Sequence, residues 1–137
     1  MPFSEYLGDE ILDWVLGTDM DTAPSNIYVA LWNGNPTADG SGGTELTSTI
    51  TGAATRTEVT SLGAISTSGN YRQTTTGSAT QITASASGAA TANYITLWDA
   101  STAGNLLYFE STTSTDIAAG AEVNLDAGNL TVRSKIA

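Results

Sequence analysis

The 137-residue chain contains no cysteine and no histidine. These two absences exclude zinc sites of the Cys/His type, thiol nucleophiles, Ser-His-Asp triads and acid–base catalysis by histidine. The catalytic option that remains is a pair of carboxylates, one of which would be held protonated by its surroundings. The composition therefore favours a protein without enzymatic activity.

Basic residues are also scarce, since 4 Lys and Arg stand against 14 Asp and Glu and give a formal net charge of −10. A surface of this sign repels phosphate backbones and anionic lipid headgroups. The chain has no apolar run of the roughly 18 residues that a membrane span requires, and its N-terminus lacks the pattern of a signal peptide. We therefore expect neither nucleic acid nor a membrane as a partner.

The length fits one domain, which we expect to comprise an N-terminal helix over residues 1–17 and a β-sandwich over residues 26–137. Ser4 is placed to cap the helix and Gly17 to end it. The apolar positions recur at helical spacing, and we expect this side, with Trp14, to be buried: Leu7, Ile11, Trp14 and Val15. The other side is acidic, and is either solvated or docks on a basic partner: Glu5, Asp9, Glu10 and Asp13.

The stretch 93–111 predicts a β-hairpin that forms the centre of the core. Its two apolar runs alternate with a period of two, and Asp99, Gly104 and Asn105 favour a chain reversal between them. Four of the chain's ten aromatic residues lie in this stretch: Tyr94, Trp98, Tyr108 and Phe109. Buried aromatic rings contribute strongly to core stability, so the hairpin should organise the fold.

Further strands are expected before and after this hairpin, over residues 27–32, 57–60, 71–74, 80–85, 122–126 and from 130 onward. Residues 37–44 are too rich in glycine for anything but a loop, and 112–115 is expected to be a polar connection. The Ser- and Thr-rich middle of the chain leaves disorder or glycosylation as an alternative. Short strands separated by turns predict a mainly β fold, an antiparallel β-sandwich or jelly-roll-like barrel with the helix covering one end.

Two pairs of carboxylates are the candidates for glycoside hydrolysis, Asp39 with Glu45 and Asp99 with Glu110. Both have structural alternatives, because Asp39 lies in a glycine loop and Asp99 begins a turn. Segments 19–21 and 39–45 carry oxygen ligands suited to calcium, but neither has the EF-hand spacing. The glycine-rich loop also lacks the ending of a phosphate-binding P-loop. We therefore expect no cofactor and no metal centre.

Two tryptophans at strand ends, Trp32 and Trp98, lie on the strand faces opposite the aliphatic residues. Such rings either pack in the core or at a subunit interface, or they form an exposed stacking platform for sugars. The sequence leaves both alternatives open.

A set of segments at both ends of the chain forms an ordered pattern. In the N-terminal third they are 3–7, 11–17, 22–24, 27–32, 35–37 and 39–45, and in the C-terminal third 94–100, 104–109, 117, 119–120 and 127–132. This ordered set resembles a family of small tailed-phage virion proteins, usually called phage tail fibre proteins, some of which are similar to capsid decoration or cement proteins. The middle, 46–92, matches poorly, since Thr51-Gly-Ala-Ala-Thr-Arg56 lacks the aromatic residue that the family shows before Ala-Arg.

This resemblance implies a non-enzymatic structural protein of the virion, and we favour a capsid decoration (cement) subunit that binds and stabilises the outer surface of the head. Its partners would be the major capsid protein and copies of itself, with a trimer as the working hypothesis by analogy. The alternative is a tail or tail-fibre component that contacts host glycans. Candidate partner-binding residues are Glu5, Asp9, Asp13, Trp32, Arg56, Trp98, Arg133 and Lys135.

Overall fold

The computed structural model describes residues 2–136, and its largest sheet is built around the predicted hairpin. The hairpin strands are β7 (Ala90–Trp98) and β8 (Leu106–Ile117), and β1 (Tyr28–Asn33) pairs with the other edge of β7. Two short strands, β2 (Thr44–Glu45) and β3 (Thr57–Glu58), share the far edge of β1. All of these pairings are antiparallel, so the expectation for residues 93–111 is confirmed.

Strand β8 is longer than expected, because it continues through 112–115, where a polar connection was predicted. Of these residues, Thr115 lies opposite Ala92, and the next residue, Asp116, lies opposite Thr91. Residues 112–114 fall where the register shifts between Ala92 and Tyr94, so the pairing is irregular there. Threonine is β-branched and suits an extended backbone even where its side chain faces solvent. The prediction of a connection at 112–115 was wrong, because polar residues also occur in extended strands.

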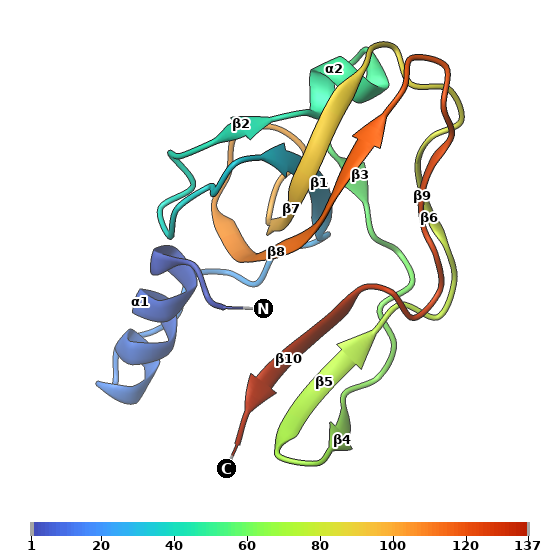
Figure 1. The fold of residues 1–137 in the computed structure, drawn as a ribbon. Coiled ribbons are helices and arrows are strands. Elements are labelled where there is room, and N and C mark those ends of the chain that lie inside the picture. Colours follow the sequence, from blue (N-terminus) through green and yellow to red (C-terminus); the bar gives the residue numbers. More distant parts are fainter. Residues whose placement is uncertain (1, 137) are drawn as a thin grey trace.

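The remaining strands form two smaller antiparallel sheets. One is built from β10 (Thr131–Lys135), β5 (Tyr71–Thr75) and β4 (Ser66–Ser68), and it extends away from the large sheet with the C-terminus (Figure 1). The other pairs β6 (Thr80–Thr83) with β9 (Val123–Leu125) and connects the two ends of the molecule. The mainly antiparallel β fold is confirmed, as sandwich-like sheets. Within residues 2–136 no sheet closes into a barrel.

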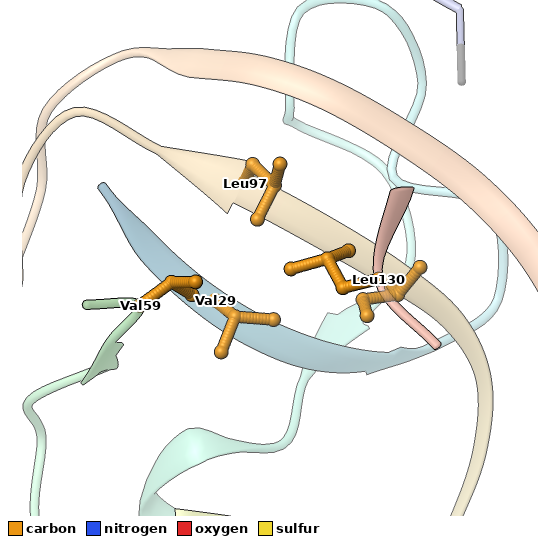
Figure 2. Packing of buried hydrophobic residues seen from close by; sticks show 5 residues of the cluster. Val29, Val59, Leu97 and Leu130 are labelled. Carbon is orange, nitrogen blue, oxygen red and sulfur yellow. The ribbon is translucent and has the colours of Figure 1, made fainter. Parts of the chain in front are cut away.

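One face of the large sheet packs against residues from the smaller sheets and forms the main aliphatic core (Figure 2). Val29 and Leu97 are each 1% exposed and lie opposite each other in the β1–β7 register. Leu130, just before β10, and Val59 cover them. Each fully buried side chain of this size contributes about 1.5–3 kcal/mol to the free energy of unfolding. This contact holds the C-terminal strand onto the large sheet.

The helix α1 (Glu5–Val15) begins at the predicted cap, where Leu7 N donates to Ser4 Oγ at 3.1 Å. Its first turn is fixed to the sheet, because Ser4 N donates to Leu107 O at 2.9 Å. Beyond that turn the helix projects from the body (Figure 1), and none of its residues is buried. Trp14 is 68% exposed, so the expectation that it packs in the core was wrong.

A second, five-residue helix, α2 (Thr47–Thr51), lies between β2 and β3 and was not predicted. It buries Ile50, which is 1% exposed, in a second apolar cluster with Leu46 and Ile117. Neither of the helices found in residues 2–136 has the length and apolar character needed to cross a bilayer.

Candidate functional site

The two tryptophans of the stacking hypothesis lie together inside the protein. The rings of Trp32 and Trp98 are stacked with centroids 6.2 Å apart and planes 12° apart, and the residues are only 6% and 7% exposed. The glycine loop covers them, since a Cβ atom on Gly40 would lie 3.0 Å from Trp98 Cη2. Trp98 Nε1 donates to Thr96 Oγ1 at 2.8 Å, and Thr96 is fully buried. The pair therefore forms core, and a sugar-stacking platform on these rings is excluded.

Arg56 is also part of this buried cluster. Its Nε and Nη2 donate to Glu45 Oε1 and Oε2 at 2.9 and 3.0 Å, which is a bidentate ion pair. Its Nη1 donates to the carbonyl oxygens of Ala100 and Ala103 at 3.1 and 2.6 Å. The guanidinium carbon lies 3.8 Å from the centroid of the Trp98 ring, close enough for a cation–π interaction. Arg56 thus joins β2 to the hairpin turn, and at 9% exposure its cationic group serves the fold instead of a partner contact.

The first carboxylate pair, Asp39 and Glu45, is occupied by structural contacts. The side chains of Thr37 and Ser41 and the backbone N–H of Ser41 donate to Asp39. These hydrogen bonds stabilise the carboxylate and lower the pKa of Asp39 to about 2. A glycosidase acid requires the opposite shift, and Glu45 is held by Arg56. This pair orders a loop and has no geometry for acid–base catalysis.

The second pair, Asp99 and Glu110, is similarly explained. Asp99 closes the hairpin turn, because its two carboxylate oxygens accept from Asn105 N and Nδ2 at 2.7 and 2.8 Å. Gly104 in this turn has φ of +73°, which glycine adopts without strain. Glu110 lies on β8 opposite Ile95, on the face of the sheet away from the tryptophans. The turn chemistry predicted from the sequence therefore accounts for Asp99.

The calcium segments gain no support from the geometry. The Asp39 oxygens accept hydrogen bonds from donors of their own loop, and Asp21 Oδ2 accepts from Tyr6 OH at 3.3 Å. Across residues 2–136 no group of three or more His, Cys, Asp or Glu is placed to hold a metal ion.

A groove of about 770 Å³ lies between β8 and the segment containing β9 and β10. Its walls carry three acids and one base: Glu110, Asp116, Glu122 and Arg133. Asp116 Oδ1 accepts from Thr91 Oγ1 at 2.7 Å, and Glu122 Oε1 accepts from Gln81 Nε2 at 3.2 Å. A hydroxyl donor and an amide donor thus contact the carboxylates of Asp116 and Glu122, and apolar side chains such as Ile117 and Leu125 also line the groove.

The remaining candidate partner residues lie on the surface. Glu5, Asp9 and Asp13 are exposed on α1, and Arg133 and Lys135 are exposed on β10. The guanidinium carbon of Arg133 lies 5.2 Å from the centroid of the Tyr71 ring across the β5–β10 pair. Exposure leaves these five side chains accessible to another protein, and their binding role stays a prediction.

Sequence reasoning missed a separate surface feature, the exposed apolar side of α1. The residues concerned are Leu12, Trp14, Val15 and Leu16, which are 59%, 68%, 66% and 80% exposed. The helical spacing indicates an amphipathic helix, but it does not show whether the apolar side packs within the chain or stays exposed.

Comparison with known proteins shows the family to which this chain belongs. No curated protein matches the chain. A family model described as "Podophage GP4 fiber I protein gp80" matches residues 2–133, including the middle segment in which the sequence resemblance was poor. Because this match spans nearly the whole chain, the protein belongs to the podophage GP4 fiber I protein gp80 family, a family of virion fibre proteins.

Proposed function

We propose that the protein is a non-catalytic structural subunit of a phage fibre and works through contacts with neighbouring virion proteins. The observation that carries this proposal is the match of residues 2–133 to a podophage fiber I family. Fibre and capsid subunits bury surface against repeated neighbours, and modest interfaces become effective when many copies bind together.

The chemistry of the side chains supports a non-catalytic role. Three of the four carboxylates proposed for hydrolysis stabilise local structure, Asp39 in its loop, Glu45 with Arg56 and Asp99 in its turn. The sequence supplies no cysteine or histidine for another mechanism. What the protein presents to its surroundings is an acidic surface with net charge −10, which keeps a protein of a large assembly soluble.

Capsid decoration is the second candidate, with the major capsid protein and copies of the chain, arranged as a trimer, as partners. It is favoured by the absence of shaft-forming features from residues 2–136: the longer helix has 11 residues, and most strands have six residues or fewer. A fibre shaft normally depends on long heptads or repeated motifs. In the fibre, a subunit of this shape would serve as a junction or terminal module.

Contact with host glycans would need a surface other than the tryptophan pair. Both rings are buried, so a fibre that binds sugars through this chain would use the exposed residues of the loop, such as Asp39 and Ser41. We therefore propose an architectural role for the chain ahead of receptor binding.

Cryo-electron microscopy of purified particles, with and without the protein, tests these candidates. The proposal predicts that density for the chain disappears from a fibre when the gene is interrupted. Loss of density over the capsid lattice would favour decoration instead. Particles that contain no copy of the chain at all would refute both structural roles.

A further inference from the structure

Helix α1 carries a wide apolar stripe, defined here as Leu7, Ile11, Leu12, Trp14 and Val15, continued by Leu16 after the helix ends. Leu7 and Ile11 are half-buried, and the rest of the stripe is exposed to solvent. These positions recur at spacings of three and four, so they form one side of the helix. Leu12, Trp14 and Val15 are 59–68% exposed, and no residue of the helix is buried. An apolar side without a cover is unusual for a soluble protein and marks an interaction site.

The chain's own return segment contacts the polar side of α1. Glu10 Oε2 accepts from the backbone N–H of Asp21 at 2.5 Å, and Tyr6 OH donates to Asp21 Oδ2 at 3.3 Å. The connection after the helix is therefore held on the acidic side, and the apolar stripe stays open. An isolated helix of this length is marginal in water and normally gains its stability by packing such a stripe. Within residues 2–136, Leu12, Trp14, Val15 and Leu16 remain without such packing.

We propose that α1 docks through its stripe in an apolar groove rimmed by Lys and Arg on a neighbouring virion protein. This inference rests on the proposed function, because it names the surface by which the subunit is held. The first 27 residues contain six acids and no basic residue: Glu5, Asp9, Glu10, Asp13, Asp19 and Asp21. Acids beside an apolar stripe match a groove with a positive rim, and this complementarity also speeds association.

The same charges argue against two other occupants. A second copy of α1 would bring acidic rims together, and like charges across an interface cost binding free energy. An anionic bilayer would repel the helix, since helices that lie on such membranes carry Lys and Arg on their polar side. A different protein with basic residues is the occupant that satisfies both the stripe and its rim.

The anchoring of α1 suits this role. Ser4 is 3% exposed and ties the start of the helix to β8, and the Phe3 ring meets the Tyr108 ring edge-on with centroids 5.3 Å apart. The helix is therefore fixed at its first turn and projects from the body (Figure 1). Leu12, Trp14 and Val15 on the projecting part are exposed. A groove recognises such a helix through residues at spacings of three, four and seven.

Incorporation into particles tests the inference. A phage with a stop codon in this gene is grown on cells that supply the tagged chain, and the tag is quantified in purified particles. One variant combines Leu12→Gln, Val15→Gln and Leu16→Gln, which keeps helix propensity and makes three of the four most exposed stripe residues polar. A second combines Asp9→Lys and Asp13→Lys. The matched control combines Ile65→Gln and Ile136→Gln, which are 67% and 57% exposed elsewhere.

We expect the incorporation of both helix variants to be at least about tenfold lower than that of the wild type, because changes to central interface residues weaken binding strongly. The control should be incorporated like the wild type. Circular dichroism should show the same fold and melting temperature for all the proteins, because the changed side chains are exposed. If the stripe variant melts lower, the charge variant decides the outcome, since its two changes leave the apolar residues in place.

Three results would overturn the inference. Wild-type incorporation of both helix variants would show that α1 is not the docking element, while the fibre role would stand. Absence of the wild-type chain from particles would instead refute the proposed function. A free chain that sediments as an oligomer, with the stripe variant monomeric, would show that the occupant is a second copy.

Discussion

Replacing Arg56 with alanine should destabilise the protein more than any change to its other basic residues. The substitution removes both hydrogen bonds to Glu45, the two hydrogen bonds from Nη1 to the Ala100 and Ala103 carbonyls, and the cation over the Trp98 ring. Breaking a buried ion pair by removing one partner costs about 3–5 kcal/mol. The Glu45 side chain keeps 26% exposure, so water recovers part of its solvation and we expect about 3 kcal/mol.

For a chain of this size, that loss lowers the melting temperature by about 10 °C. Thermal and urea unfolding followed by circular dichroism measure both quantities. The stability of Arg56→Lys should lie between that of the wild type and that of Arg56→Ala. Lysine keeps the charge but lacks the planar guanidinium group that reaches Glu45 and the turn carbonyls together. The control is Arg72→Ala: Arg72 is exposed and donates to Thr67 Oγ1 at 2.6 Å, so its loss should cost less than about 0.5 kcal/mol.

A double-mutant cycle with Glu45→Gln separates the ion pair from the other contacts of Arg56. We expect a coupling of about 1 kcal/mol or more, as for residues in direct contact. An Arg56→Ala protein as stable as the Arg72→Ala control would refute the role given to this cluster.

Other substitutions test the loop, the core and the helix. The pKa of Asp39 is lowered from 3.8 to about 2, so the stability it contributes is present above about pH 4 and is lost as the pH falls toward 2. In Asp39→Asn the melting temperature should therefore fall less steeply than in the wild type between about pH 5 and pH 2. The same dependence of melting temperature on pH in both proteins would contradict this role of Asp39. Gly43→Ala places a Cβ atom 2.8 Å from Gly34 O at φ +64° and should cost about 1–3 kcal/mol in urea unfolding. Leu97→Ala, at 1% exposure, should cost about 2–5 kcal/mol by the same assay, and a smaller loss would contradict the assigned core. Gly8→Ala meets no atom within 4 Å and should raise helicity and stability by up to about 1 kcal/mol.

Local chemistry made much of the fold predictable. Ser4 caps α1, and the alternating residues of β1, β7 and β8 form strands, because each signal involves neighbours a few positions apart. Asp99 closes the hairpin turn for the same reason. The short helix α2 was missed because its N-cap residue, Leu46, offers no side-chain cap and the helix consists of Thr, Ser and Ile.

The environment of the tryptophans could not be derived in this way. Periodicity identifies the two sides of an element, but contacts distant in sequence decide which side is covered. Trp98 is buried by Arg56 and by Gly40, both more than 40 positions away, whereas Trp14 lies in the projecting part of a helix and stays 68% exposed. The same limit applies to Arg56, whose partners lie 11 to 47 positions along the chain.

The candidate partner-binding residues on the surface were predictable only in part. The acids of α1 and the bases Arg133 and Lys135 were selected by charge, and the structure leaves them exposed. Charge patterns reveal the sign of a surface but not its counterpart, so the partner has to be found by experiment.

The central claim is that this protein acts as a part of an assembled particle. Quantitative mass spectrometry of phage particles purified on a density gradient measures this directly, as the number of copies of the chain per copy of the major capsid protein. The claim predicts a fixed ratio, with multiple copies per particle, that persists through repeated purification. Recovery of the chain only in the soluble fraction of the lysate, with none in the particles, would contradict it.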